Sequence, residues 1–271
     1  MKQELTLDQI HKQTIGLIKK YISICERIKV DYCVYYGSLI GAVRHHGFIP
    51  WDDDFDVIML RPDFNRFISY CIKNKASLYP YELKCRQTDK DYPYNIPRFC
   101  DTRFIMEKEN IDTNMGLFID IYPFDGVGNN CKAAKRKISL RKNLYNSCIT
   151  YINKEAKPTS KVFYKNILRK IVFLYSKMHT REYFFNKLNC LKELYPYDNS
   201  EYVECIVWSS FFNPVKKAWL KPFETIDFEN IEVKIPNNYH AILSDRYGDY
   251  MQLPPEKERK PHHDYKLYMI R

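Results

Sequence analysis

The sequence has 271 residues, 45% of them hydrophobic and 15% aromatic, which is enough to bury a sizeable core in one domain. The 28% charged residues, the 8 glycines and the absence of an internal repeat exclude disordered, low-complexity and solenoid proteins. Nine scattered cysteines without a C-x-x-C pair indicate reduced thiols. We expect a cytoplasmic protein, because there is no signal-peptide pattern and no apolar stretch long enough to span a bilayer.

The amino-terminal part of the chain is predicted to form a helix, a strand, a tight turn and a second helix. A capping box at Thr6–Gln9 opens an amphipathic helix that continues through residue 28. The aromatic and β-branched run 32–36 predicts a strand. It ends at Gly37-Ser38, a turn that leads into a helical segment from Ser38 to Arg44.

The next elements predict a mixed α/β core over the first 125 residues. A loop at 45–50 is followed by a strand at 54–60, which stops before Pro62, the first residue of a helix over 62–73. Further strands are predicted at 81–85, 97–105 and 116–122, the last of them halted by Pro123.

The second half of the chain is predicted to be helical first and mixed afterwards. Residues 132–194 lack strand signals and read as helices with a break near 157–160. A hairpin is predicted at 223–235, and a helix that starts at 236–238 and runs to Arg246 is ended by Tyr247-Gly248. The tail from Asp249 onward is expected to be irregular.

The net charge of +10 is concentrated in one segment. Residues 132–181 contain fourteen Lys or Arg and the single acid Glu155, a local charge of +13, so the rest of the chain carries −3. The run 162–175 mixes apolar and cationic residues, and it could lie on an anionic inner leaflet of a membrane or form an ordinary packed, solvated helix. No nucleic-acid recognition motif accompanies the charge, so we expect no nucleic-acid partner.

Closely spaced carboxylates form the candidate chemical centre. Alternate residues of a strand share a face, so Asp54 and Asp56 are expected to project together, roughly 6.5 to 7 Å apart. Asp52 and Asp53 add like charge, which a hard divalent cation such as Mg²⁺ would compensate. The Asp52–Asp54 run could also be a solvated turn and helix cap.

Two further features favour a phosphate-handling site over that acidic turn. Gly37-Ser38 would offer free backbone N–H groups and a hydroxyl to a phosphate. Asp120 lies on an apolar strand, where an unpaired charge would be expensive. Three acids beside a phosphate-holding turn predict a two-metal phosphoryl-transfer site.

The stretch from Tyr36 to Asp56 closely resembles the LicD family, which is named for bacterial phosphocholine transferases and is related to fukutin-type proteins. The resemblance continues at Gly116–Asp125, Arg246–Met251 and Leu253–Pro255, and it covers most of the chain outside the basic segment. It implies one LicD-like domain over 1–271. Its parts would be a catalytic α/β core at 1–130, a basic helical insertion at 131–200 and the carboxyl-terminal part of the core at 201–271.

The resemblance also implies a nucleotidyltransferase-like fold, with a mixed sheet flanked by helices, in which Gly37 and Ser38 hold phosphate while Asp54 and Asp56 bind Mg²⁺ or Mn²⁺. The implied reaction moves a phospho-alcohol group from a CDP-linked donor to a hydroxyl of a cell-surface glycan or its lipid-linked precursor, with release of CMP. Asp120 is the expected third carboxylate and possible base, and Asp125 competes with it.

Several residues keep two interpretations. Arg44 and Arg98 could clamp phosphate oxygens or form ordinary ion pairs. His45-His46 and His262-His263 lack a spaced third ligand and are expected to be loop histidines. Trp51 could help to cage a quaternary ammonium, or it could be part of an aromatic core.

Three other functions compete with the phosphotransferase. A glycosyltransferase also uses an Asp-x-Asp pair and would leave phosphate on its nucleotide. A nucleotidyltransferase would release pyrophosphate. A scaffold would keep the fold without chemistry.

Overall fold

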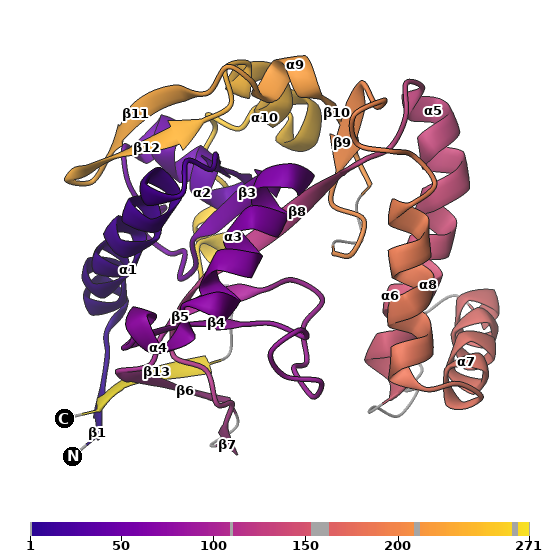
Figure 1. Cartoon of the computed structure of the whole chain (residues 1–271), viewed down its shortest axis with the longest axis horizontal. Helices are drawn as coiled ribbons and strands as arrows, with labels where there is room; N and C mark the ends of the chain where they lie inside the picture. Colours follow the sequence, from indigo (N-terminus) through magenta and orange to yellow (C-terminus); the bar gives the residue numbers. More distant parts are fainter. Residues whose placement is uncertain (1, 109–110, 153–162, 209–211, 262–264, 271) are drawn as a thin grey trace. The chain divides into compact units, whose positions relative to one another are not determined.

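The computed structural model describes residues 2–108, 111–152, 163–208, 212–261 and 265–270 (Figure 1). These residues form two compact units, one made of the chain up to Pro123 together with the part from Ala218 onward, and one made of Phe124–Lys217. The predicted α/β class is confirmed, with mixed sheets flanked by helices. Within the described ranges, no helix combines the length and the apolar character that crossing a bilayer requires.

The main sheet of the first unit carries the acidic segment. Its strands lie in the order β2 (Cys33–Val34), β3 (Asp56–Leu60), β8 (Leu117–Gly126), β5 (Arg98–Asp101) and β4 (Tyr81–Lys84). Every residue of β3 and β8 is buried, as expected for central strands with near-continuous apolar sequence. The last residues of β8 belong to the second unit, where they pair with β9 (Tyr202–Glu204).

Two long helices pack together on this sheet. The predicted capping box begins α1 (Leu7–Arg27), because Thr6 accepts from the Gln9 backbone and donates its own N–H to the Gln9 side chain. Pro62 occupies the first turn of α3 (Arg61–Lys73), as predicted. Tyr21 of α1 and Phe67 of α3 meet with ring centroids 5.1 Å apart, and both contact Phe99 of β5. This aromatic cluster fixes both helices to the sheet.

The carboxyl-terminal part returns to this unit and supports the loop before the acids. The predicted hairpin is present as β11 (Glu224–Phe228) and β12 (Ile231–Ile235). At its tip, Glu229 donates its backbone N–H to the His46 carbonyl, and its carboxylate accepts from the Phe48 N–H. The predicted helix follows as α10 (Tyr239–Tyr247) and ends at Gly248, whose φ is 69°. Short helical segments complete the unit: α4 (Lys75–Leu78), α9 (Lys217–Leu220) and η3 (Glu256–Glu258).

The tail from Asp249 is not irregular throughout, as the sequence predicted. Its end forms β13 (Tyr265–Ile270), which lies between β1 (Lys2–Glu4) and β6 (Phe104–Lys108), and β7 (Ile111–Asp112) completes this second sheet. β13 is stabilised by pairing with strands that are distant in the sequence, so its own residues carry only a weak strand signal.

The other corrections concern element ends. β3 begins at Asp56 instead of Asp54. The predicted strand 97–105 is two strands in different sheets, because Asp101 accepts from the Arg103 backbone and turns the chain between β5 and β6. Pro123 does not end β8. It lies between the residues of β8 that pair with β5 and those that pair with β9, so no neighbouring strand on that edge requires a backbone N–H from residue 123.

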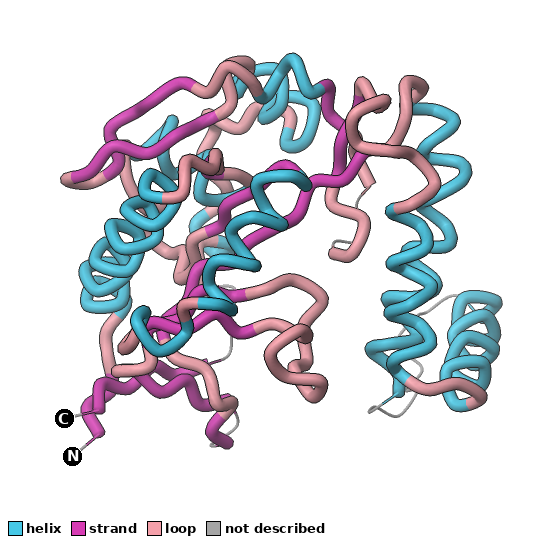
Figure 2. The backbone as a smooth tube through the Cα atoms, viewed as in Figure 1, coloured by secondary structure: helices cyan, strands magenta, loops and turns pink. Residues whose placement is uncertain are grey.

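The second unit is largely helical, which confirms the prediction for 132–194, although the predicted break at 157–160 lies outside the described residues (Figure 2). Helices α7 and α8 both pack on α6. The elements are α5 (Cys131–Ala134), the π-helical turn η2 (Lys135–Ser139), α6 (Leu140–Ile152), α7 (Phe163–Lys177), α8 (Arg181–Lys192), β9 and β10 (Val215–Lys216).

Candidate active site

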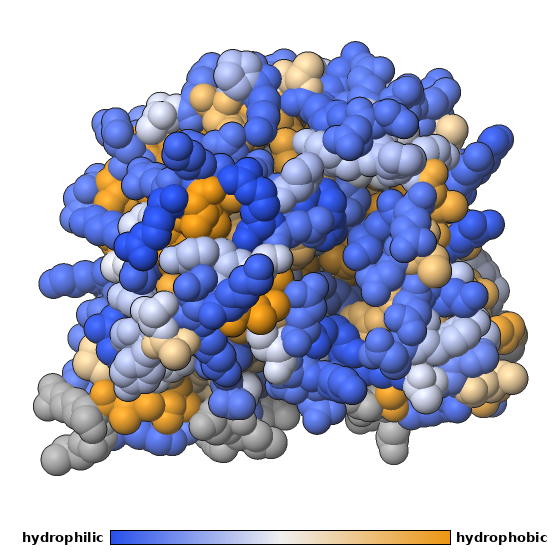
Figure 3. Space-filling model, in the orientation of Figure 1, coloured by the Kyte–Doolittle hydropathy of each residue, from blue (hydrophilic) through white to orange (hydrophobic). Residues whose placement is uncertain are grey.

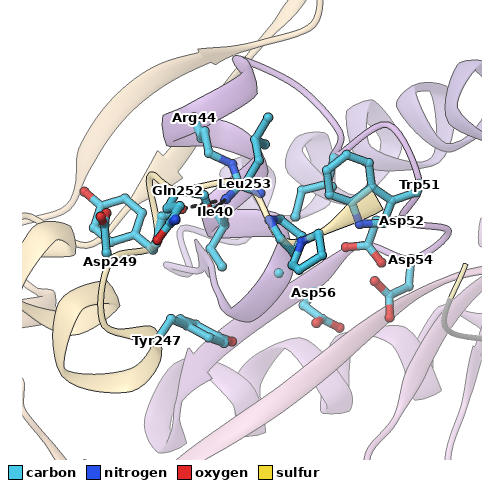
Figure 4. Close-up of a pocket in the computed structure, with 15 residues that line it drawn as sticks. Ile40, Arg44, Trp51, Asp52, Asp54, Asp56, Tyr247, Asp249, Gln252 and Leu253 are labelled. Carbon is cyan, nitrogen blue, oxygen red and sulfur yellow. Dashed lines mark hydrogen bonds between the residues drawn. The ribbon is translucent and has the colours of Figure 1, made fainter. Parts of the chain in front are cut away.

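A cavity of about 640 Å³ opens in the first unit, within the size range of small-molecule sites (Figure 4). Three segments line it: the helical turn after β2, the acidic segment that leads into the start of β3, and the stretch that begins at the end of α10. The lining residues are Gly37, Ile40, Arg44, Ile49, Trp51, Asp52, Asp54, Asp56, Tyr247, Asp249, Tyr250, Gln252, Leu253, Pro254 and Pro255.

The backbone of the acidic segment is held in place from several directions. The Asp52 N–H donates to the Ile49 carbonyl, and the Asp52 carbonyl lies 2.6 Å from Nε2 of His11. The His11 ring stacks on Phe48 with centroids 4.3 Å apart. The Tyr265 hydroxyl donates to the Asp53 carbonyl. These contacts fix the backbone that carries the acidic side chains.

Asp52, Asp54 and Asp56 gather on one side of the cavity below Trp51 (Figure 4). Asp56 is buried, and Asp54 is half-buried. Burial, followed by the charges of Asp54, Asp120 and Asp52, raises the pKa of Asp56 well above its usual range, and a hydrogen bond with Tyr122 opposes this. The ionised form of this cluster therefore requires added positive charge.

A divalent cation fits these residues. Oδ1 of Asp56 is buried and has no hydrogen-bond partner among the described residues, so it is an oxygen ligand in need of a cation or donor. No group of three His, Cys, Asp or Glu side chains in the described ranges makes a complete ligand set. Mg²⁺ commonly takes one or two carboxylates and completes its shell with water and substrate phosphate, so Asp54 and Asp56 suit it.

Asp120 and Arg98 form a buried pair behind the cluster. Nε and Nη2 of Arg98 donate to the two carboxylate oxygens of Asp120 at 2.6 and 3.2 Å. The guanidinium also lies over the rings of Tyr94 and Phe118. Although burial opposes the charged form, Asp120 raises the pKa of Arg98. Arg98 is therefore engaged by Asp120, and neither residue lines the cavity.

The competing acid Asp125 lies further along β8, in the second unit. It pairs in register with Glu204 of β9, and both side chains are buried. Glu204, Asp125 and the buried Lys142 all act on the pKa of Cys205, which burial raises to about 12. Asp125 thus shares a buried charged cluster with residues of its own unit.

The Gly37-Ser38 pair lies inside a short helix, α2 (Tyr36–Ile40), which continues as a π-helical turn, η1 (Gly41–His45). The helix therefore begins at Tyr36, before the predicted start at Ser38. Tyr36 has a φ of 51°, a left-handed conformation that is strained for tyrosine. Gly37 lines the cavity, and a Cβ there would lie 2.9 Å from Oδ2 of Asp52. The Ser38 hydroxyl is buried and accepts from the Asp56 N–H.

Arg44 connects the helical turn to the stretch after α10. Its Nη1 donates to the carbonyls of Tyr250 and Gln252, and its Nε donates to Nε2 of His45. Burial, then the charge of Arg44, lowers the pKa of His45. Arg44 lines the cavity, but some of its N–H groups already donate hydrogen bonds within the cavity wall. His262 and His263 lie outside the described residues.

Several residues in and around the cavity were not singled out by the sequence. Tyr122 acts on Asp56 from β8, and Arg246 of α10 lies over the ring of the strained Tyr36. Tyr247 and Tyr250 line the wall with Trp51, over which the Arg259 guanidinium lies at 5.6 Å. The block Arg246–Met251 was visible as part of the resemblance, although no role could be attached to it.

A family model and one full-length relative point to the same family. Residues 29–148 match the model "LicD/FKTN/FKRP, nucleotidyltransferase domain". The chain is 31% identical to the lipopolysaccharide cholinephosphotransferase LicD of Haemophilus influenzae, over 99% of this chain and 100% of that protein. It is also similar to uncharacterized proteins of Rickettsia prowazekii (32% identical, 45% of this chain and 42% of that protein) and Rickettsia typhi (39% identical, 46% and 36%).

Proposed function

Because the chain belongs to the LicD family, we propose that it transfers a phosphocholine-like group from a CDP-linked donor to a hydroxyl of a glycan or its lipid-linked precursor, releasing CMP. The observation that carries the proposal is the buried Asp56 with its unpartnered Oδ1, beside Asp52 and Asp54 in a cavity of ligand size. Such a site suits a substrate that arrives with a cation and phosphate oxygens.

Asp54 and Asp56 would hold Mg²⁺ or Mn²⁺. When bound, the ion supplies positive charge that neutralises the donor's diphosphate and the departing CMP. Ser38 holds the Asp56 backbone, and Tyr122 holds its side chain, so the carboxylate is oriented in advance. Gly37 lets a phosphate approach the backbone of the turn, because a side chain there would meet Asp52.

The reaction we propose is an in-line displacement. The acceptor oxygen forms a bond to the choline-bearing phosphorus, the bond from that phosphorus to the CMP oxygen breaks, and the hydroxyl proton moves to a carboxylate. Asp120 is our candidate for this base and for the third carboxylate. Arg98 donates one hydrogen bond to each carboxylate oxygen of Asp120, so each oxygen can still accept a second one.

The aromatic wall gives the donor's alcohol a place to bind. Trp51, Tyr247 and Tyr250 line the same cavity as the acids. Ring faces attract quaternary ammonium groups, and Arg259 already places a cation over Trp51. We therefore expect choline to be preferred over uncharged alcohols.

The test is CMP release from CDP-choline, CDP-ethanolamine and a CDP-polyol, with lipopolysaccharide-type acceptors and with Mg²⁺, Mn²⁺ or a chelator. Asp54→Asn and Asp56→Asn should each lower turnover by at least about a hundredfold, as loss of a principal electrostatic contact in a site of this kind does. Asp227→Asn, which changes an exposed acid on β11, is the matched control and should stay fully active.

Each alternative outcome would identify a different function. Consumption of sugar nucleotides with phosphate left on the nucleotide would identify a glycosyltransferase. Pyrophosphate release from CTP would identify a nucleotidyltransferase. Full activity of both Asn variants would overturn the assignment of the carboxylates, and absence of turnover with every donor would favour a scaffold.

A further inference from the structure

Helix α7 carries a stripe of large apolar side chains that other described residues leave uncovered. Their exposed fractions lie between 46% and 75%, whereas a side chain in a core would be almost fully covered. Figure 3 shows hydrophobic surface over this helix, at the lower right edge of the view. The stripe consists of Tyr164, Ile167, Leu168, Ile171, Leu174 and Met178, the last just past the helix end.

The stripe is separate from the face with which α7 packs on its own unit. The inner face meets α6, where the Val172 carbonyl accepts from Cys148 and the ring of Phe173 lies 6.4 Å from that of Tyr151. Ser176 on this face is buried. The outer residues recur at helical spacings of three and four, which places them together on the opposite side. The helix is therefore apolar on two sides, and only one is used inside the unit.

The charged residues of α7 all have one sign. The sequence from 156 to 181 contains seven Lys or Arg and no Asp or Glu. On α7, Lys165 and Lys170 are exposed on either flank of the stripe, and Lys177 donates to the Ile152 carbonyl at the end of α6. The occupant of this face must therefore offer apolar surface together with negative charge.

We propose that α7 docks on an anionic lipid surface, with the stripe inserted among the acyl chains and the lysines against the headgroups. Such a surface supplies both required properties, and a helix of this composition lies in the plane of the interface. A second copy of the chain fits less well, because pairing two stripes would bring the flanking lysines of both copies together. The proposal concerns a surface of the second unit and does not depend on the proposed reaction.

Flotation of the full chain with vesicles tests this inference. We expect binding to vesicles of phosphatidylcholine with phosphatidylglycerol, and little binding to phosphatidylcholine alone. Leu168→Gln/Ile171→Gln/Leu174→Gln should reduce partitioning by more than about tenfold per residue. Lys165→Gln/Lys170→Gln should reduce it by about fivefold per lysine at low salt.

Matched controls distinguish binding through α7 from nonspecific adsorption of the protein to vesicles. Ile72→Gln changes an exposed apolar residue of α3, and Lys12→Gln/Lys19→Gln changes two exposed lysines of α1, so neither variant should alter binding. Tryptophan emission of a Leu174→Trp variant should shift to the blue when anionic vesicles are added. Circular dichroism of each variant confirms that it is folded.

Three outcomes would overturn the inference. The first is failure of the folded wild type to bind anionic vesicles at low salt. The second is equal binding by the wild type and the triple Gln variant. The third is self-association without lipid that the triple variant abolishes, which would make a second copy the occupant.

Discussion

The Ser38 hydroxyl accepts a hydrogen bond from the backbone N–H of Asp56 at 2.9 Å, between the helix after β2 and the first residue of β3. Both groups are buried, so the bond is shielded from water. Through this bond, the helical turn on one side of the cavity supports the Asp56 carboxylate on the other side. Ser38 therefore acts on Asp56 through the backbone, as a positioning residue.

Ser38→Ala should lower both stability and turnover. It leaves a buried N–H without an acceptor, which costs about 1 to 3 kcal/mol, and it frees the start of β3 to move. We expect turnover with CDP-choline to fall by about tenfold or more while Mg²⁺ is saturating. Urea unfolding and CMP release measure the two effects. Thr102→Ala, which removes a hydroxyl bond to the Pro80 carbonyl, should affect stability alone.

Arg98 and Asp120 should behave as one unit. Arg98→Met leaves a buried carboxylate without its partner and should destabilise the protein by about 3 to 5 kcal/mol, whereas Arg98→Met with Asp120→Leu should recover much of that loss. The double variant should nevertheless stay inactive, because it lacks the proposed third carboxylate. A double-mutant cycle by denaturant unfolding provides the measurement. Full activity of the refolded double variant would remove Asp120 from the reaction.

Two glycines of the helical turn should respond differently to alanine. A Cβ on Gly37 would lie 2.9 Å from the end of the Asp52 side chain, which can move, whereas a Cβ on Gly41 would lie 2.5 Å from the Gly47 carbonyl, which is backbone. Gly37→Ala should therefore unfold at nearly the wild-type midpoint with impaired turnover. Gly41→Ala should be destabilised by about 1 to 3 kcal/mol. The opposite order would contradict this account of the turn.

The parts of the fold that the sequence predicted are those with strong local signals. The capping box of α1, Pro62 at the start of α3, and the hairpin followed by a helix that ends at Gly248 were all predicted. The strand β13 and the division of 97–105 into two strands depend on pairing between distant segments, which leaves no local pattern. Pro123 was misjudged for the same reason, since its tolerance depends on which partner strand lies beside it.

In the site, as in the fold, some residues could be predicted from the sequence and others could not. The sequence pointed to Asp54 and Asp56, which do line one cavity, and to Gly37 beside them. It could not foresee that Asp120 would engage Arg98 on both oxygens, because their pairing arises from the register of β5 and β8. Nor could it choose Tyr122 among 23 tyrosines, because only the fold brings that hydroxyl to Asp56.

Asp31 should give the first unit a pH-dependent contribution to stability. Partial burial alone would raise its pKa, but hydrogen bonds from Lys234 at 2.7 Å and Lys221 at 3.0 Å outweigh burial and hold the pKa below its ordinary value. The folded protein thus favours the ionised form more than the unfolded chain does. The stabilisation is present above the unfolded value of about 3.9 and is lost as the pH falls through the folded value.

Asp31→Asn should therefore lower the free energy of unfolding at neutral pH, and the difference from the wild type should shrink as the pH falls below about 4. The effect should be no more than about 1 kcal/mol, because water screens the pair, whose side chains are about 40% exposed. Urea unfolding at several pH values is the measurement. Glu224→Gln, at an exposed acid of β11, is the control. A difference that stayed constant down to strongly acidic pH would show that Asp31 acts through packing instead of charge.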